Sequence, residues 1–275
     1  TKPVWQPSWT TIDEIMEQVA GITRGERIRL IAELYQVYVK HHPSESFDKF
    51  YFWGDMLISD FDLIDKYMVD ASQLLRNIAE IKECEADVSY LTPEQLRIIS
   101  FWKSIGDNDS LTEQKQRFLK VWRSLPAIYN EFRATLLSKG IGYTGMIYRL
   151  AAERLKSGEA ELSSDRRYIV AGFNALSDSE KVLFDYIQNS SKGAEFYWDY
   201  DSYYVANDDH EAGMFLRENI SRYPATEPIS NNSFRLSNKR LRSIACVSNV
   251  VQCKYVAKLL EELPKEELDK RTAIV

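Results

Sequence analysis

Hydrophobic side chains in the first part of the chain recur every three or four residues, the spacing of one buried helix face. The first run starts after Ser8 or Thr10, either of which can cap a helix, and stops at Gly21, which can end one. Further helices are predicted over residues 28–41, from Thr92 onwards, over Leu111–Ser138 with a kink at Pro126, and over Thr144–Lys156. Residues 46–85 carry apolar side chains on more than one face and are expected to lie between other elements, with Asp60-Phe61-Asp62 as the place where this stretch could break.

After about Ser157 the helical period gives way to short apolar runs of strand length. Residues 168–173, 194–198, 244–247 and 273–275 read as strands, and residues 177–188, 210–222 and 250–263 read as helices. Alternation of strand and helix is typical of parallel strands joined by crossovers, and continuous apolar strands suit a sheet covered on both faces. The sequence therefore predicts an α/β fold with an open, mostly parallel sheet. A large all-helical domain, residues 1–160, would precede the partial α/β domain, residues 161–275.

The composition indicates a folded chain and limits its partners. With 275 residues, of which 44% are hydrophobic, material for a core is ample. The 41 acidic residues outnumber the 35 basic ones, which argues mildly against strong non-specific DNA binding but leaves room for a local basic strip. The sequence has no apolar run near the ~18 residues of a membrane helix and no visible signal peptide. Its three cysteines, Cys84, Cys246 and Cys253, form no CxxC pair, so a reducing cytoplasm is expected.

Candidate chemistry is sparse. The sequence contains neither the GxxxxGK[ST] nor the GxGxxG phosphate loop, and no serine lies in a GxSxG elbow. The best metal candidate is the stretch from Trp198 to Glu211, because carboxylates bind hard cations and His210 adds a transition-metal ligand. The competing and preferred interpretation places Asp199 and Asp201 at a strand edge and lets Asp208 and Asp209 cap the next helix. We therefore expect no catalytic, cofactor-binding or metal-binding residue in this chain.

Two runs of basic residues could contact nucleic acid. The first interleaves aromatic and basic side chains in one helix, with Trp122 as a possible stacking platform: Lys115, Arg117, Lys120, Trp122 and Arg123. We expect Trp122 to pack inward, which makes this run a solvated helix face. The second run is denser and is the candidate contact with DNA or with another subunit: Arg235, Lys239, Arg240 and Arg242. Its alternative interpretation is a plain solvated loop.

Several short segments, in their order along the chain, resemble one protein family. They are residues 50–57 (FYFWGDML), 59–62 (SDFD), 90–95 (YLTPEQ), 145–149 (GMIYR), 170–176 (VAGFNAL), 196–201 (FYWDYD) and 269–275 (DKRTAIV). Together they resemble the N-terminal, helicase-like region of bacterial PD-(D/E)XK nuclease family proteins. These are similar to the AddB-type subunit of ATP-dependent helicase-nucleases, which process double-strand DNA breaks. The resemblance covers nearly the whole chain, and its motifs are packing signatures rather than catalytic ones.

The resemblance implies a P-loop, superfamily-1-like helicase layer with a large helical insertion. It also implies that the nucleotide-binding loop precedes Thr1, and that the nuclease domain and any iron–sulfur cysteines follow Val275. The chain itself would then be an inactive fragment of a nuclease, with a scaffold and DNA-path role in DNA repair. Its expected partners are DNA, contacted weakly or indirectly, and a partner subunit of the helicase-nuclease, with no membrane involved.

Two other functions remain open at the level of sequence. A protein-interaction module that docks a partner subunit would expose an apolar patch near the helical half. A free-standing hydrolase that uses the region from Asp199 to His210 would bind a divalent ion.

Overall fold

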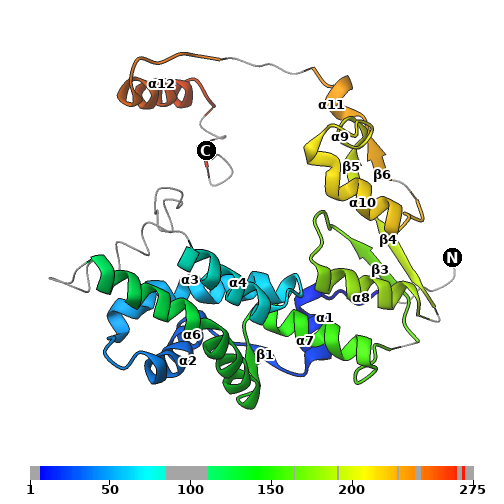
Figure 1. Cartoon of the computed structure of the whole chain (residues 1–275). Helices are drawn as coiled ribbons and strands as arrows, with labels where there is room; N and C mark the ends of the chain where they lie inside the picture. Colours follow the sequence, from blue (N-terminus) through cyan, green and yellow to red (C-terminus); the bar gives the residue numbers. More distant parts are fainter. Residues whose placement is uncertain are drawn as a thin grey trace. The chain divides into compact units, whose positions relative to one another are not determined.

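The computed structural model describes residues 7–84, 111–163, 165–190, 192–227, 229–238, 243–264 and 268–269. The chain forms two compact units, Thr1–Asn231 and Asn232–Val275 (Figure 1). The boundary that the change of period predicts after residue 160 falls inside the first unit and stays a prediction. The helix predicted to start at Thr92 and the strand predicted at residues 273–275 lie outside the described residues.

The first unit is built mainly from helices, with short strands between them. In chain order the helices are α1 (Ile12–Ala20), α2 (Arg27–His41), α3 (Phe47–Lys66), α4 (Ala71–Cys84), α6 (Leu111–Ser138), α7 (Thr144–Ser157), α8 (Asp178–Gln188), α9 (Ser202–Val205), the 3-10 turn η1 (Glu211–Gly213) and α10 (Met214–Arg222). The strands are β1 (Thr23–Arg24), β2 (Ile141–Gly142), β3 (Tyr168–Ala171), β4 (Ala194–Tyr197), β5 (Asp199–Asp201) and β6 (Ile229–Asn231).

The caps of α1 show how local sequence sets its ends. The hydroxyl of Thr11 accepts a hydrogen bond from the Glu14 N–H, and the Glu14 carboxylate accepts one from the Thr11 N–H. The N-cap is therefore Thr11, and the prediction of Ser8 or Thr10 was wrong, because only Thr11 stands three residues before a glutamate that closes this capping box. The predicted end at Gly21 is confirmed, with a φ of 68° that glycine adopts without steric cost.

Helix α3 does not break at Asp60-Phe61-Asp62 but continues to Lys66, because its polar side chains find partners in place. One Asp62 carboxylate oxygen accepts a hydrogen bond of 2.6 Å from the Gly145 N–H, and the other lies 3.0 Å from the Lys66 ammonium. The turn comes later, at Met68, whose φ is 52°.

The main core lies where α2, α3, α6 and α7 pack together, with α1 against α7 and α4 against α6 (Figure 1). Its fully buried side chains include Tyr38, Phe50, Phe61, Phe132 and Ala151, which come from four different helices. The predicted helix over Leu111–Ser138 is confirmed as α6, which carries Pro126 inside it.

The predicted open parallel sheet is wrong, and so is the P-loop helicase-like layer that the family resemblance implies. Of the described residues, 62% are helical and 8% lie in strands. The strands form three separate parallel pairs, β1–β2, β3–β4 and β5–β6, each only two to four residues long. One of these pairs, β1–β2, lies within the region predicted to be all-helical.

The apolar runs fail to make a sheet layer for identifiable physical reasons. Strand β3 ends at Ala171 because Gly172, at a φ of 86°, turns the chain, and its Ile169 is 62% exposed rather than covered. Residues 244–247 form no strand, and Val247 is 95% exposed. An apolar run indicates a strand only where another strand is available beside it, and none is described beside residues 244–247.

The second unit contains α11 (Ser233–Leu236) and α12 (Asn249–Glu261). Helix α12 confirms the helix predicted over 250–263 and is capped by Ser248, whose hydroxyl accepts from the Val251 N–H. Neither helix has a buried residue. In the part of the chain that the structure describes, no helix has both the length and the apolar character needed to cross a bilayer.

Candidate functional site

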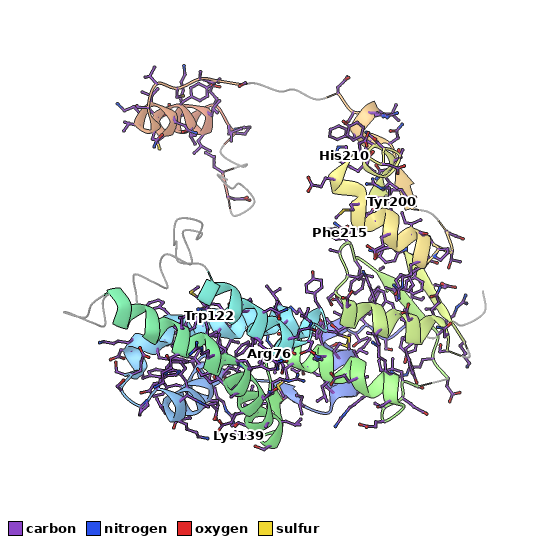
Figure 2. All side chains as sticks on the ribbon, viewed as in Figure 1. Arg76, Trp122, Lys139, Tyr200, His210 and Phe215 are labelled. Atoms are coloured by element: carbon purple, nitrogen blue, oxygen red, sulfur yellow. The ribbon has the colours of Figure 1, made fainter. Side chains whose placement is uncertain are left out.

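The predicted basic contact is only partly described. Arg235 lies in α11 and is exposed, whereas Lys239, Arg240 and Arg242 lie outside the described residues. In the other basic run, the side chains of Lys115 and Arg117 also lie outside the described residues. Trp122 is partly buried against the main core, as expected (Figure 2), and Lys120 is exposed.

The acidic stretch does not converge on a metal. Asp201 caps α9, where its carboxylate accepts a 2.9 Å hydrogen bond from the Tyr203 N–H. Asp199 is exposed, and Asp208 has a carboxylate oxygen 3.7 Å from the Arg217 Nε. The described residues contain no group of three or more His, Cys, Asp or Glu side chains that could hold an ion.

The ring of His210, which is labelled in Figure 2, packs against two tyrosine rings. Its ring centroid lies 5.4 Å from that of Tyr203 and 4.9 Å from that of Tyr204, edge to face in both cases. Its buried Nδ1 has no hydrogen-bond partner among the described residues. The contacts of this histidine are therefore aromatic packing contacts.

Arg217, which the sequence pattern did not single out, organises this loop. Its guanidinium donates to four backbone carbonyls, those of Tyr204 (3.1 Å), Asn207 (2.8 Å), Asp208 (2.9 Å) and His210 (3.0 Å). Guanidinium groups suit such a role because five N–H donors are fixed in one plane. The loop from α9 to η1 is thus held by one arginine on α10.

The other two histidines are also structural. His41 lies 3.6 Å from a carboxylate oxygen of Glu131. His42 stacks on Tyr38 at 4.6 Å between ring centroids, and its Nε2 lies 2.9 Å from the Ser124 hydroxyl. Burial, together with nearby Lys120 and His41, lowers the pKa of His42 to about 4, so the ring is neutral near pH 7.

A buried carboxylate connects three helices of the main core. Asp65 of α3 is 0% exposed, and it accepts hydrogen bonds from the hydroxyls of Tyr129 and Tyr143. The guanidiniums of Arg133 and Arg149 each lie 3.4 Å from the same carboxylate. Burial and the Asp65 charge both raise the pKa of the two tyrosines, so they stay protonated as donors. A charge this buried needs such partners to be tolerated.

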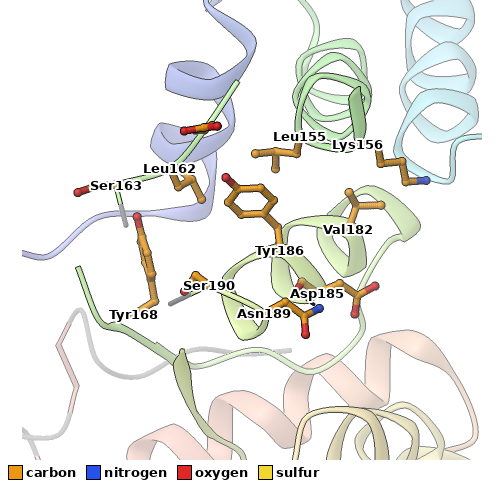
Figure 3. A pocket seen from close by; sticks show the side chains of 11 residues that line it. Leu155, Lys156, Leu162, Ser163, Tyr168, Val182, Asp185, Tyr186, Asn189 and Ser190 are labelled. Carbon is orange, nitrogen blue, oxygen red and sulfur yellow. Dashed lines mark hydrogen bonds between the residues drawn. The ribbon is translucent and has the colours of Figure 1, made fainter. Parts of the chain in front are cut away.

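A cavity of about 570 Å³ lies between the end of α7 and α8 (Figure 3). Tyr168 and Tyr186 lie on its wall together with Lys156 and Glu161. Asp185 also faces it but is engaged by Arg222 at 2.6 Å and by the Tyr223 hydroxyl at 2.9 Å. The wall thus combines tyrosine rings with one cation and two carboxylates.

An aromatic cluster packs against α8, the helix that lines this cavity. Trp198 is 1% exposed, and its indole N–H donates to the Tyr223 carbonyl at 2.8 Å. Phe196 stacks on Tyr223 with ring centroids 4.9 Å apart, and Phe184 of α8 packs edge-on against the same tyrosine. The segment that resembles a family motif, residues 196–201, therefore begins with buried packing residues.

Comparisons with known proteins add no relative: no protein-family model, no curated protein and no solved structure matches this chain. Over the residues that it describes, the structure is mostly helical, with three short parallel strand pairs.

Proposed function

We propose that this chain is a non-catalytic part of a bacterial DNA-repair helicase-nuclease, similar to the AddB type, and that it contributes a scaffold and part of the DNA path. One observation carries the proposal. Segments that resemble this family lie far apart in the sequence, yet they interlock in the fold. The SDFD segment, residues 59–62, meets the GMIYR segment, residues 145–149, at the Asp62–Gly145 hydrogen bond.

The contact between these segments is too close for other residue types. A Cβ on Gly145 would lie 2.1 Å from the Asp62 carbonyl oxygen, so α3 and α7 can meet there only through glycine. Arg149, from the same segment, donates a 2.7 Å hydrogen bond to the Val69 carbonyl just past the end of α3. These residues support the resemblance because they have the packing role that it assigns to its motifs.

DNA binding is the part of this proposal that is tested first. We expect the chain to bind a tailed duplex with an affinity that falls steeply between about 50 and 200 mM salt, because phosphate contacts release counterions. Fluorescence anisotropy at several salt concentrations measures this. Equally weak binding at both ends of the range would remove the DNA-path role and leave the scaffold role.

The second basic run provides a separate test of that role. Charge reversal at Arg235, Lys239 and Arg240 should weaken binding if this run contacts the duplex. The control is the opposite change, in which three exposed carboxylates outside this run are replaced by lysine. This change should leave DNA binding unchanged or strengthen it.

A docking module for a partner subunit is the alternative function, and the surface of α12 favours it. Val251, Tyr255 and Leu259 recur every four residues and so share one face of the helix, and both aliphatic side chains are about 40% exposed, at 41% and 38%. Substitution of Val251 and Leu259 by aspartate should abolish binding of a helicase-nuclease partner while leaving DNA binding intact. The reverse pattern would favour the DNA-path role.

A further inference from the structure

A second cavity, of about 390 Å³, lies beside the β1–β2 pair and is distinct from the cavity of Figure 3. We call it the β1–β2 cleft. Three segments line it: residues 24–30 after β1, the last two turns of α3, and Tyr143 with Thr144 at the start of α7. Because β1 and β2 are parallel, their carboxyl ends meet at the same edge and both lead directly into helices.

Cationic side chains dominate the lining of the β1–β2 cleft. Arg24, Arg27 and Lys66 line it, whereas Asp62 is the one carboxylate among its lining residues. Lys66 pairs with Asp62 at 3.0 Å, and the Arg27 Nε pairs with Asp55 at 2.5 Å. Two carboxylates therefore balance two of the three cations, and the excess positive charge falls on Arg24.

Arg24 is the cation whose partner is missing. It is exposed, it faces the cleft, and it makes no hydrogen bond or ion pair among the described residues. A neutral donor is available nearby, because the Thr144 hydroxyl lines the cleft. The Ser59 hydroxyl is already engaged, since it accepts from Arg27 at 2.6 Å and donates to the Asp55 carbonyl at 3.0 Å. The first turn of α2, which has no side-chain cap, adds a weaker positive potential. The carboxylate in the lining, that of Asp62, is already paired with Lys66, so the donors around Arg24 are available to an anion that accepts several hydrogen bonds.

We propose that the β1–β2 cleft holds one phosphate group, with Arg24 as its main ligand and Lys66 and Thr144 as supporting donors. The inference rests on the proposed function in one respect, namely that the phosphate belongs to a DNA strand. A phosphodiester fits because its two free oxygens accept a forked pair of hydrogen bonds from a guanidinium. Lys66 can bridge Asp62 and the phosphate, since an ammonium has three donors.

The test uses the full chain and a single-stranded oligodeoxynucleotide, with affinity measured by fluorescence anisotropy across a salt series. Arg24→Gln should weaken binding several-fold and lower the slope of log affinity against log salt by about 0.7, the value for one phosphate contact to a single strand. The matched control is Arg76→Gln, because Arg76 is an exposed arginine on α4 that does not line the cleft (Figure 2). This control should keep the wild-type affinity and slope.

A second arm separates DNA from free phosphate. Calorimetric titration of the chain with pyrophosphate should show binding that Arg24→Glu abolishes and Arg76→Glu leaves unchanged. If Arg24→Gln binds DNA as tightly as the control Arg76→Gln does, the inference is overturned and the proposed function remains. Pyrophosphate binding through Arg24 without any DNA binding would retain the phosphate site and refute the proposed DNA path. If the chain binds poly-glutamate but neither the oligodeoxynucleotide nor pyrophosphate, the assignment of the cleft to phosphate is overturned.

Discussion

The Tyr143 hydroxyl donates a hydrogen bond of 2.5 Å to the carboxylate of Asp65, although 78 positions separate the two residues in the sequence. Both side chains are buried, at 2% and 0% exposure. The bond ties the end of α3 to the start of α7, beside the β1–β2 cleft that Tyr143 also lines. The buried network of the main core and the proposed phosphate site therefore share one residue.

Asp65 should be among the most sensitive positions for stability. Asp65→Ala leaves two guanidiniums and two tyrosine hydroxyls without their common acceptor, which should lower the free energy of unfolding by about 3–5 kcal/mol. Equilibrium urea unfolding, followed by tryptophan fluorescence, measures the loss. Glu153→Ala is the matched control, because Glu153 pairs with Arg149 of the same network at 2.9 Å but is 46% exposed. That substitution should cost less than about 1 kcal/mol, and equal losses would contradict a special role for the buried carboxylate.

Gly145 should tolerate no side chain, even though alanine favours helices. Because an added Cβ would lie 2.1 Å from the Asp62 carbonyl oxygen, Gly145→Ala must separate α3 from α7. We expect a loss of at least about 2 kcal/mol in the free energy of unfolding, within the usual range for an overpacked core. Gly140→Ala is the control, since nothing lies within 4 Å of its added Cβ and only its φ of 67° opposes alanine. A smaller loss at Gly145 than at Gly140 would refute the close approach.

These two positions also show how far the sequence could predict the fold. The helix over residues 177–188 was predictable, because Ser177 and Glu180 form a capping box that is local in sequence. The role of Asp65 was not, because its four partners come from residues 64 to 84 positions away and no pattern announces them. An aspartate in a long apolar helix looks like a surface residue until the opposing helices are in place.

The sheet failed for a related reason. An apolar run favours burial and a strand, but both depend on a neighbouring element that only the tertiary structure provides. Residues 168–171 found one in β4, whereas residues 244–247 did not. The β1–β2 cleft could not be predicted either, because Arg24 and Lys66 are isolated cations in the sequence and only the fold brings them to the lining of one cavity.

His42 should make stability depend on pH below neutrality. Burial lowers its pKa in the folded chain to about 4, below the ordinary value of 6.5, so the unfolded chain binds the proton more tightly. Its contribution is therefore fully present above about pH 6.5 and is lost as the pH falls through 6.5 towards 4. Urea midpoints of the wild type and of His42→Gln, measured between pH 7.5 and 4.5, should converge as the pH falls. Parallel pH profiles for the two proteins would show that His42 is protonated equally in both states.

Arg217 should hold the loop between α9 and η1 without contributing much to global stability. Its four carbonyl contacts need a planar group with several donors, so Arg217→Lys should release the loop while keeping the charge. Hydrogen exchange over residues 204–213 should then speed up about tenfold, which corresponds to about 1.4 kcal/mol of local opening free energy. Arg222→Lys is the control on the same helix, because Arg222 pairs with Asp185 instead of the loop.

The amide of Gly213 is the most direct reporter, because its N–H donates to the His210 carbonyl that Arg217 also contacts. An unchanged exchange rate at Gly213 in Arg217→Lys, or an equal change in Arg222→Lys, would mean that the loop is held by its own backbone turns.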